Sequence, residues 1–370
     1  MSKSNKSKNN ESKQKMYKPN KRGTFQLLYE LYTIHSPTRN ESKMRDFLLS
    51  WLKKYGIPHY LDKKTGCIFY LNPHQPLLSA HMDQVQREAP SFDDLRECGD
   101  RILAPGFGLG ADDKNGIWII LSELYLGKLN QEPMPSFILS TSEECASENA
   151  TACFERNFLD ADEKPLVPFA LVLDRRGKGD IIGFENGYCS LDFESKVEEI
   201  SDRNQMGYKR TQGVYSDADG LSNYINCVNL SVGYYNAHTI EEETSRTDLM
   251  RAWNFVRHLL KARDELAAIP FEGKRIGKWD RWDTWGGTKR NDIYAVCMTE
   301  DQIEYLNMLL DREHSMIMDK LNNIWEGYSE ENWSVETTTK KEKELEEEGE
   351  YISAIQDELY NAENVKNYKF

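Results

Sequence analysis

Residues 110–116 read GADDKNG, a glycine-bounded turn that carries two adjacent aspartates. The apolar-rich stretch that follows, 115–128, predicts a helix. Such a turn opens the helix and lets one carboxylate point into a cleft at the end of a sheet. The alternative is an ordinary cap, in which the aspartate accepts a hydrogen bond at the helix N-terminus.

Four further motifs with potential metal ligands lie in order around this turn. They are LLSAHMD (77–83), STSEEC (140–145), LVLDRRG (171–177) and YYNAHT (234–239). With GADDKNG, they offer one ligand each: His81, Asp112, Glu144, Asp174 and His238. The first three intervals are each about one strand–helix–strand unit long. Because strand ends converge at one edge of an open α/β sheet, this order favours a shared site.

Two of these motifs carry a second acidic residue. Asp83 follows His81 in a His-x-Asp pattern, and a nearby carboxylate commonly orients a metal-binding imidazole. The alternative is a surface histidine beside a chance aspartate. Glu143 and Glu144 end another predicted strand, where adjacent carboxylates repel each other unless a cation or a proton compensates. The alternative there is an exposed acidic loop.

The rest of residues 23–266 alternates between helix and strand patterns. Helices are predicted at 24–33, 42–55 and 239–266, and strands at 66–71, 76–80, 136–141, 169–173, 183–193 and 227–235. The last helix is placed by Thr239 and Glu242, which match a capping box. The alternation predicts an α/β fold, with a mixed, mostly parallel sheet flanked by helices.

Both ends of the chain depart from this pattern. Residues 1–22 are rich in Lys, Ser and Asn and lack an apolar core, so they predict a disordered basic tail and no secretory signal. Residues 267–370 begin with a Trp- and Gly-rich stretch and continue with helical patterns near 300–325 and 340–363. We expect a helical C-terminal extension, through which the chain would self-associate.

Composition excludes several classes of partner. The net charge of −14 over 370 residues argues against nucleic acid, because phosphate binding needs a basic face. No apolar run reaches the ~18–20 residues that a membrane span requires. The seven cysteines are scattered and form no CxxC pattern, which is typical of a reducing cytoplasm.

The ligand types indicate two-metal chemistry. Two divalent ions roughly 3.5–4 Å apart can share a bridging carboxylate and a bridging water. Each ion also needs ligands of its own and one open position. A further glutamate, close to the ions but not bound by them, must take the proton from the water and deliver it to the leaving amine. Glu143 and Glu144 are adjacent, so one of them can bind a metal ion while the other transfers the proton.

Taken together, these motifs resemble those of the co-catalytic zinc exopeptidases of clan MH, which include peptidase T, carboxypeptidase-type enzymes and aminopeptidases. The resemblance covers roughly residues 24–263. It implies an α/β fold with two divalent ions, zinc by preference and cobalt or manganese as substitutes, at the carboxyl ends of the strands. It also implies a hydrolase that acts on a peptide or small amide, and the cysteine usage places it in the cytoplasm.

The resemblance assigns a role to each motif residue. Asp112 would bridge the two ions, with His81, Glu144, Asp174 and His238 as the other ligands. Glu144 and Asp174 would bind opposite ions, and the sequence leaves open which histidine goes with which. Glu143 would be the general base. Asp83 would orient His81, and Asp113 would support the site from behind the ligands.

The chain also departs from the family. Carboxypeptidase-type members insert a dimerisation domain between the last two ligands, and the interval from Asp174 to His238 is too short for it. This favours a single-domain aminopeptidase. In addition, CASENA follows Glu144, where family members more often have a turn containing glycine.

The substrate is less clearly indicated. Arg175 and Arg176 would clamp a substrate carboxylate, or else form local salt bridges. Asp217 and Asp219 would meet a free amino terminus, or else serve turn chemistry. Aminopeptidase, carboxypeptidase or dipeptidase, and N-acyl amidohydrolase activities therefore stay open. From other functional classes, a lapsed metal-binding scaffold and an assembly protein acting through its C-terminal helices are the alternatives.

Overall fold

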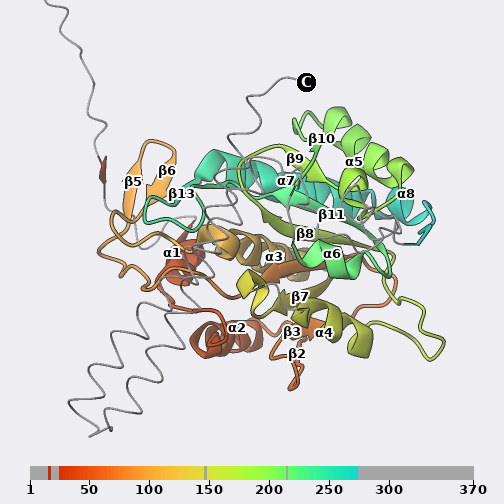
Figure 1. The fold of residues 1–370 in the computed structure, drawn as a ribbon, viewed down its shortest axis with the longest axis horizontal. Coiled ribbons are helices and arrows are strands. Elements are labelled where there is room, and N and C mark those ends of the chain that lie inside the picture. The colour runs from red at the N-terminus through yellow and green to blue at the C-terminus, as the bar shows by residue number, and fades with distance from the viewer. Residues whose placement is uncertain (1–15, 18–24, 146–147, 214–215, 274–370) are drawn as a thin grey trace, which may run out of the picture. The chain divides into compact units, whose positions relative to one another are not determined.

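The computed structural model describes residues 16–17, 25–145, 148–213 and 216–273 (Figure 1). All of them belong to the first of the two units into which the chain divides, Met1–Trp285. Most of the predicted basic tail, and the helices predicted near 300–325 and 340–363, lie outside the described residues.

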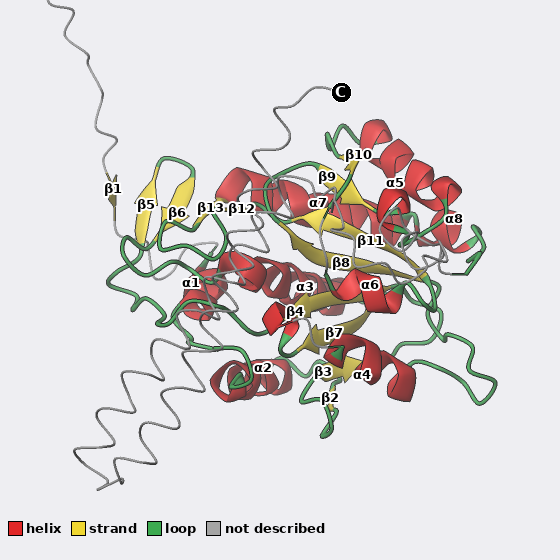
Figure 2. Ribbon diagram, viewed as in Figure 1, coloured by secondary structure: helices red, strands yellow, loops and turns green. Residues whose placement is uncertain are grey.

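An eight-stranded sheet forms the centre of this unit, in the order β10-β9-β11-β8-β4-β7-β3-β2 (Figure 2). Its four central strands are parallel: β11 (Asn226–Ser231), β8 (Phe169–Arg175), β4 (Leu77–His81) and β7 (Ser136–Ser140). Toward the edges lie β10 (Lys209–Thr211), β9 (Asp180–Ile182), β3 (Ile68–Tyr70) and β2 (Tyr60–Leu61), which add three antiparallel pairings. The predicted mixed, mostly parallel sheet is confirmed.

Apolar side chains cover both faces of the central strands. On β8, Phe169, Leu171 and Leu173 join one apolar cluster, whereas Ala170 and Val172 join the other. All five are fully buried. Because successive strand residues point to opposite faces, both faces of β8 pack against apolar clusters. The charged candidate residues lie at or beyond the strand ends.

Helices cover the two faces unequally. The first cluster packs under α1 (Gln26–Tyr32), α2 (Ser42–Lys54), α3 (Ala111–Asn130), α5 (Leu191–Arg203), α7 (Arg246–Lys261) and α8 (Arg263–Ala267). The second packs under α4 (Asn149–Asn157) and α6 (Asp217–Leu221), which lie side by side (Figure 1). Apart from the two corrections below, the predicted helices and strands are confirmed, with shifts at their ends.

A second, antiparallel sheet has the order β1-β5-β6-β13-β12. Its strands are β1 (Met16–Tyr17), β5 (Arg96–Cys98), β6 (Arg101–Leu103), β12 (Tyr234–Tyr235) and β13 (Glu243–Ser245). The paired strands β12 and β13 hold the two ends of the loop 236–242, which carries His238.

The strand predicted over 183–193 is wrong. The strand at this place is β9, which ends at Ile182, and the chain continues through the 3-10 turn η2 (Phe184–Asn186) into α5. Ser190 caps this helix, with its hydroxyl oxygen 3.2 Å from the amide nitrogen of Phe193. Tyr188 and Phe193 are buried, so they have the apolar character of a buried strand without its geometry.

The capping box predicted at Thr239 is also wrong. Helix α7 begins at Arg246, where Ser245 is the N-cap and accepts a hydrogen bond from the amide of Asp248 at 3.1 Å. Glu242 is fully buried and accepts hydrogen bonds from a different part of the chain. It is therefore unavailable to cap a helix at Thr239.

Two further expectations can be compared with the described part of the chain. None of its helices is long and apolar enough to cross a membrane. Its six cysteines form no disulfide.

The start of α7 can be tested with a pair of alanine substitutions. We expect Ser245→Ala to lower the free energy of unfolding by about 0.5–2 kcal/mol, because the helix loses its N-cap. Thr239→Ala removes the hydroxyl that the rejected capping box would use, and should cost less. Urea unfolding followed by circular dichroism measures both. A larger loss for Thr239→Ala would contradict a helix that begins at Arg246.

Candidate metal centre

The carboxyl ends of three central strands bring the predicted ligands together. His81 is the last residue of β4, Asp174 lies near the end of β8, and Glu143 and Glu144 follow β7 in the 3-10 turn η1 (Glu143–Cys145). These strands are neighbours and parallel, so their ends meet at one edge of the sheet. His238 reaches the same edge from the loop 236–242.

Asp112 lies at the middle of this group, in the first turn of α3. Its Oδ1 is 3.2 Å from Nε2 of His81, and its Oδ2 is 3.2 Å from Nε2 of His238. One carboxylate thus faces two imidazoles, with one oxygen toward each. This is the arrangement that a ligand shared between two ions requires.

The remaining ligands divide into two sets around Asp112. His81, Asp112 and Asp174 form one set, and Asp112, Glu144 and His238 form the other. Within each set, the candidate ligand atoms lie within 4.8 Å of one another. In the structure, His81 lies with Asp174, and His238 lies with Glu144, at 3.0 Å.

Asp83 connects His81 to the two glutamates. Its Oδ1 lies 3.4 Å from Nδ1 of His81. The same carboxylate accepts hydrogen bonds from the amides of Glu143, at 3.0 Å, and Glu144, at 3.2 Å. Asp83 can therefore orient the imidazole and also hold the turn from which both glutamate side chains extend.

Glu143 lies beside the ligands but belongs to neither set. Its Oε2 is 3.9 Å from Nε2 of His81, and the residue is buried. This is the position expected of a proton-transfer group that stands next to metal-binding atoms without being one of them.

Asp113 supports the site from behind. It follows a cis peptide bond from Asp112, and its carboxylate accepts hydrogen bonds from the amides of His81, at 3.2 Å, and Gly116, at 3.1 Å. Only glycine fits at position 116, because a Cβ there would collide with the carbonyl oxygen of Leu173 and with the Asp113 carboxylate. The glycine of the motif thus lets α3 start close against β8.

The electrostatics of the centre favour bound cations. Burial and the nearby Asp112 raise the pKa of Asp174 to about 7. Burial and the charge of Asp174 raise the pKa of Glu143 well above its usual value. Burial also opposes ionisation of Asp112, but hydrogen bonds from His238 and His81 bring its pKa below the usual value. Divalent cations would neutralise these crowded carboxylates, and mixed imidazole and carboxylate donors fit zinc.

The four residues predicted to bind substrate differ in their contacts within the protein. Nε of Arg175 lies 3.1 Å from Oδ2 of Asp180, which is the local salt bridge considered as its alternative. The backbone carbonyl of Arg176 accepts a hydrogen bond from Ser231. Asp217 is buried and accepts a hydrogen bond from Ser140 at 2.6 Å, and burial raises its pKa to about 6. Asp219 lies on the same short helix, α6. Their contacts with a substrate remain predictions.

Sequence reasoning missed two buried charged residues behind the ligands. Glu242 accepts the amide hydrogen bond of Asp112 at 3.1 Å. Lys114, in the ADDK motif, donates to the side chain of Gln84 and to the carbonyl of Ile34. Burial lowers the pKa of Lys114 to about 7. Lys114 lies within the GADDKNG motif and Glu242 within the predicted capping box, but nothing in the residue pattern showed that they are buried.

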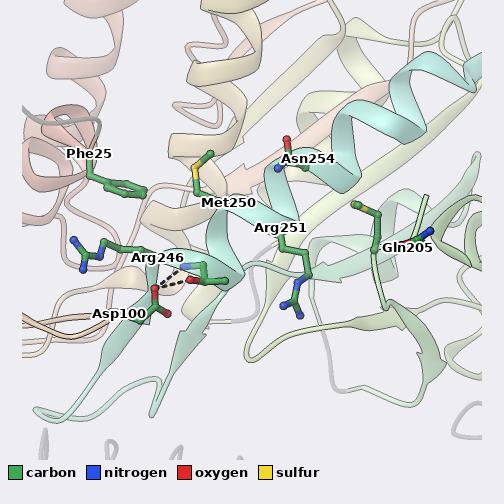
Figure 3. A pocket seen from close by; sticks show the side chains of 9 residues that line it. Phe25, Asp100, Gln205, Arg246, Met250, Arg251 and Asn254 are labelled. Atoms are coloured by element: carbon green, nitrogen blue, oxygen red, sulfur yellow. Dashed lines mark hydrogen bonds between the residues drawn. The ribbon is translucent and has the colours of Figure 1, made fainter. Parts of the chain in front are cut away.

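A separate pocket of about 490 Å³ lies at the start of α7 (Figure 3). None of its lining residues is one of the predicted site residues. Two of its charged side chains have partners within the protein. Asp100 accepts hydrogen bonds from Thr247, and Arg246 forms a salt bridge with Glu97. The pocket is therefore a weaker candidate for a catalytic or metal site than the sheet edge.

Comparison with known proteins identifies the fold. Neither a family model nor a curated protein matches this chain. The structure is similar to that of the aminopeptidase PepT from Bacillus cereus, with a TM-score of 0.52 and 16% identity over 65% of this chain and 98% of that chain.

Two archaeal structures are similar to the same extent. The aminopeptidase APDkam598 from Desulfurococcus kamchatkensis gives a TM-score of 0.52 and 12% identity, covering 66% of this chain and 97% of its own. The TET1 peptidase of Pyrococcus horikoshii gives 0.51 and 14%, covering 64% and 99%. At such identities, the likeness establishes a common fold.

The two ligand sets predict the metal content of the protein. We expect the purified protein to bind about two divalent ions per chain and to release them in acid, because the ligands must be deprotonated. His81→Ala and His238→Ala should each weaken one position, whereas Asp112→Ala should weaken both. Elemental analysis after dialysis against zinc provides the measurement. A wild-type protein that holds no metal at neutral pH would contradict the assignment.

Proposed function

We propose that this protein is a two-metal hydrolase of peptide bonds, and that it acts as an exopeptidase of the aminopeptidase type. The observation that carries the proposal is the Asp112 carboxylate, which presents one oxygen to each of two histidine–carboxylate sets. Glu143 stands beside these sets without belonging to either. Together they offer a place for two ions and a separate proton carrier.

The residues suggest how hydrolysis would proceed. The bound ions would polarise the scissile carbonyl and lower the pKa of a water molecule. Glu143 takes a proton from this water, whose oxygen forms a bond to the carbonyl carbon. Glu143 then gives the proton to the amide nitrogen as the carbon–nitrogen bond breaks. One carboxyl group thus serves as base and then as acid, and is regenerated at the end of the cycle.

The surrounding residues would keep this proton carrier in place. The hydrogen bond from the Glu143 amide to Asp83 fixes the start of its side chain. Glu144, the next residue, belongs to a ligand set, so metal binding would further immobilise the turn. Holding a catalytic group in position in this way lowers the entropic cost of reaching the transition state.

Three observations support the aminopeptidase type over the alternatives. The described residues between Asp174 and His238 build β9, α5, β10, α6 and β11 of the main fold and leave no separate lid. Arg175 pairs with Asp180, which makes it a weaker candidate for a substrate carboxylate. The similar structures are described as aminopeptidases and a peptidase. Asp217 and Asp219 then remain candidates for contact with a substrate amine.

The setting of the enzyme is also part of the proposal. Zinc is the preferred ion, with cobalt or manganese as substitutes, because both sets mix imidazole and carboxylate donors. Cysteine usage favours a reducing cytoplasm. The similar TET1 peptidase is described as assembling into a tetrahedron or a large octahedral shell, which supports self-association here as well.

The role of Glu143 can be separated from metal binding. Glu143→Gln keeps the shape of the side chain and both ligand sets but removes the proton carrier. We expect turnover to fall by about 10²–10⁴-fold, since this is the usual contribution of a general acid–base group. Metal content should stay at the wild-type level, which elemental analysis of the same sample checks. Near-normal turnover in this variant would show that another group carries the proton.

A matched pair of peptides can show whether the protein removes residues from the amino end or the carboxyl end of a peptide. An N-acetylated peptide and its C-amidated counterpart are incubated with the metal-loaded protein, and products are followed by mass spectrometry. An aminopeptidase should lose activity on the acetylated peptide and keep it on the amidated one, because the free amine would be bound by acidic groups. The reverse pattern would favour a carboxypeptidase, dipeptidase or N-acyl amidohydrolase.

A further inference from the structure

Glu242 is a buried carboxylate that the proposed reaction does not use directly. The residue is fully buried and is the last residue of the loop 236–242, which carries His238. Its Oε2 accepts hydrogen bonds from the amides of Leu109, at 3.0 Å, and Ala111, at 3.1 Å. Its Oε1 accepts one from the amide of Asp112, at 3.1 Å. Both oxygens are therefore engaged by a single short segment.

That segment leads into α3 and ends at the shared ligand. Gly108 and Gly110 both have positive φ values, 72° and 60°, and these turns direct the amides toward Glu242. A Cβ on Gly108 would lie 2.6 Å from the carbonyl oxygen of Thr239. The segment before Asp112 and the loop after His238 are thus packed directly against each other.

Gln86 completes the surroundings of this carboxylate. Its Nε2 lies 3.1 Å from Oε2 of Glu242. A buried carboxylate is costly unless its oxygens accept hydrogen bonds, so these four donors offset part of the cost of burying Glu242. An amide in place of the carboxylate would point its NH2 group at one or more of the donors that an oxygen now faces.

We infer that Glu242 is a positioning residue that sets Asp112 and His238 relative to each other. It holds the amide of Asp112 directly, and it is joined to His238 through the short stretch 239–241. The side chains of Asp112 and His238 meet at 3.2 Å. Glu242 therefore links Asp112 to the loop that carries His238, in addition to the direct contact between the two side chains. The inference rests on the proposed function, because it concerns how a two-ion centre is assembled.

The test compares Glu242→Gln with Glu241→Gln, which removes the same charge from the exposed neighbouring residue. Each full-length variant is stripped of metal and titrated with zinc alone in competition with a chelating dye. We expect Glu242→Gln to bind zinc about 10–100-fold more weakly, as is typical when a group that supports a ligand is lost. Glu241→Gln should bind like the wild type.

Thermal unfolding of the metal-free proteins separates positioning from general loss of structure. For Glu242→Gln, we expect weaker zinc binding at temperatures where the metal-free variant is still folded. Gln86→Ala removes only one of the four donors, and it provides a milder variant if Glu242→Gln does not fold. It should shift zinc affinity in the same direction and by less.

The possible results have distinct meanings. Wild-type affinity in both Glu242→Gln and Gln86→Ala, with two ions bound by the wild-type protein, would overturn the positioning role and leave the proposed function standing. Equal weakening in Glu241→Gln and Glu242→Gln would also overturn it, because a change of overall charge would then suffice. A wild-type protein that binds no zinc would overturn the proposed function and this inference together.

Discussion

The constraint on which this structure depends is the gathering of carboxylates in a space almost closed to water. Asp83, Asp112, Glu143 and Glu144 are buried together at the end of the central strands. Among the described residues of this group, the imidazoles of His81 and His238 are the groups that can carry positive charge. Burial and mutual repulsion raise the pKa of Asp174 and Glu143, so the group favours either protons or cations. A pair of divalent ions would bind Asp112, Glu144 and Asp174 and would offset the negative charge of the whole group.

The fold favours this cluster of carboxylates because it brings charged side chains together at the ends of the central strands. The central strands pack against apolar clusters on both faces, so charged side chains are favoured at the strand ends. His81, Asp174 and the glutamate pair occupy those ends on adjacent parallel strands. The start of α3 then inserts Asp112 between them. The ends of the central strands and the start of α3 thus carry four of the candidate ligands, and the loop 236–242 adds the fifth.

The sequence predicts much of the site because its ligands lie within short motifs at strand ends. His81, Asp112 and Asp174 could be named for this reason, and the structure brings them together. The pairing of each histidine with one acidic ligand was not predictable, because it depends on how the loop carrying His238 folds back. Local patterns also failed where tertiary contacts override them. Glu242 fits a capping box in sequence, but backbone amides of a distant segment bind it in the interior.

The two candidate ligand sets draw on different lengths of the chain. The set of His81, Asp112 and Asp174 is complete once the chain has reached β8. The set of Asp112, Glu144 and His238 waits for the last loop, which is held between β12 and β13. A chain cut before the loop 236–242 would therefore keep every residue of the first set and lose His238 from the second.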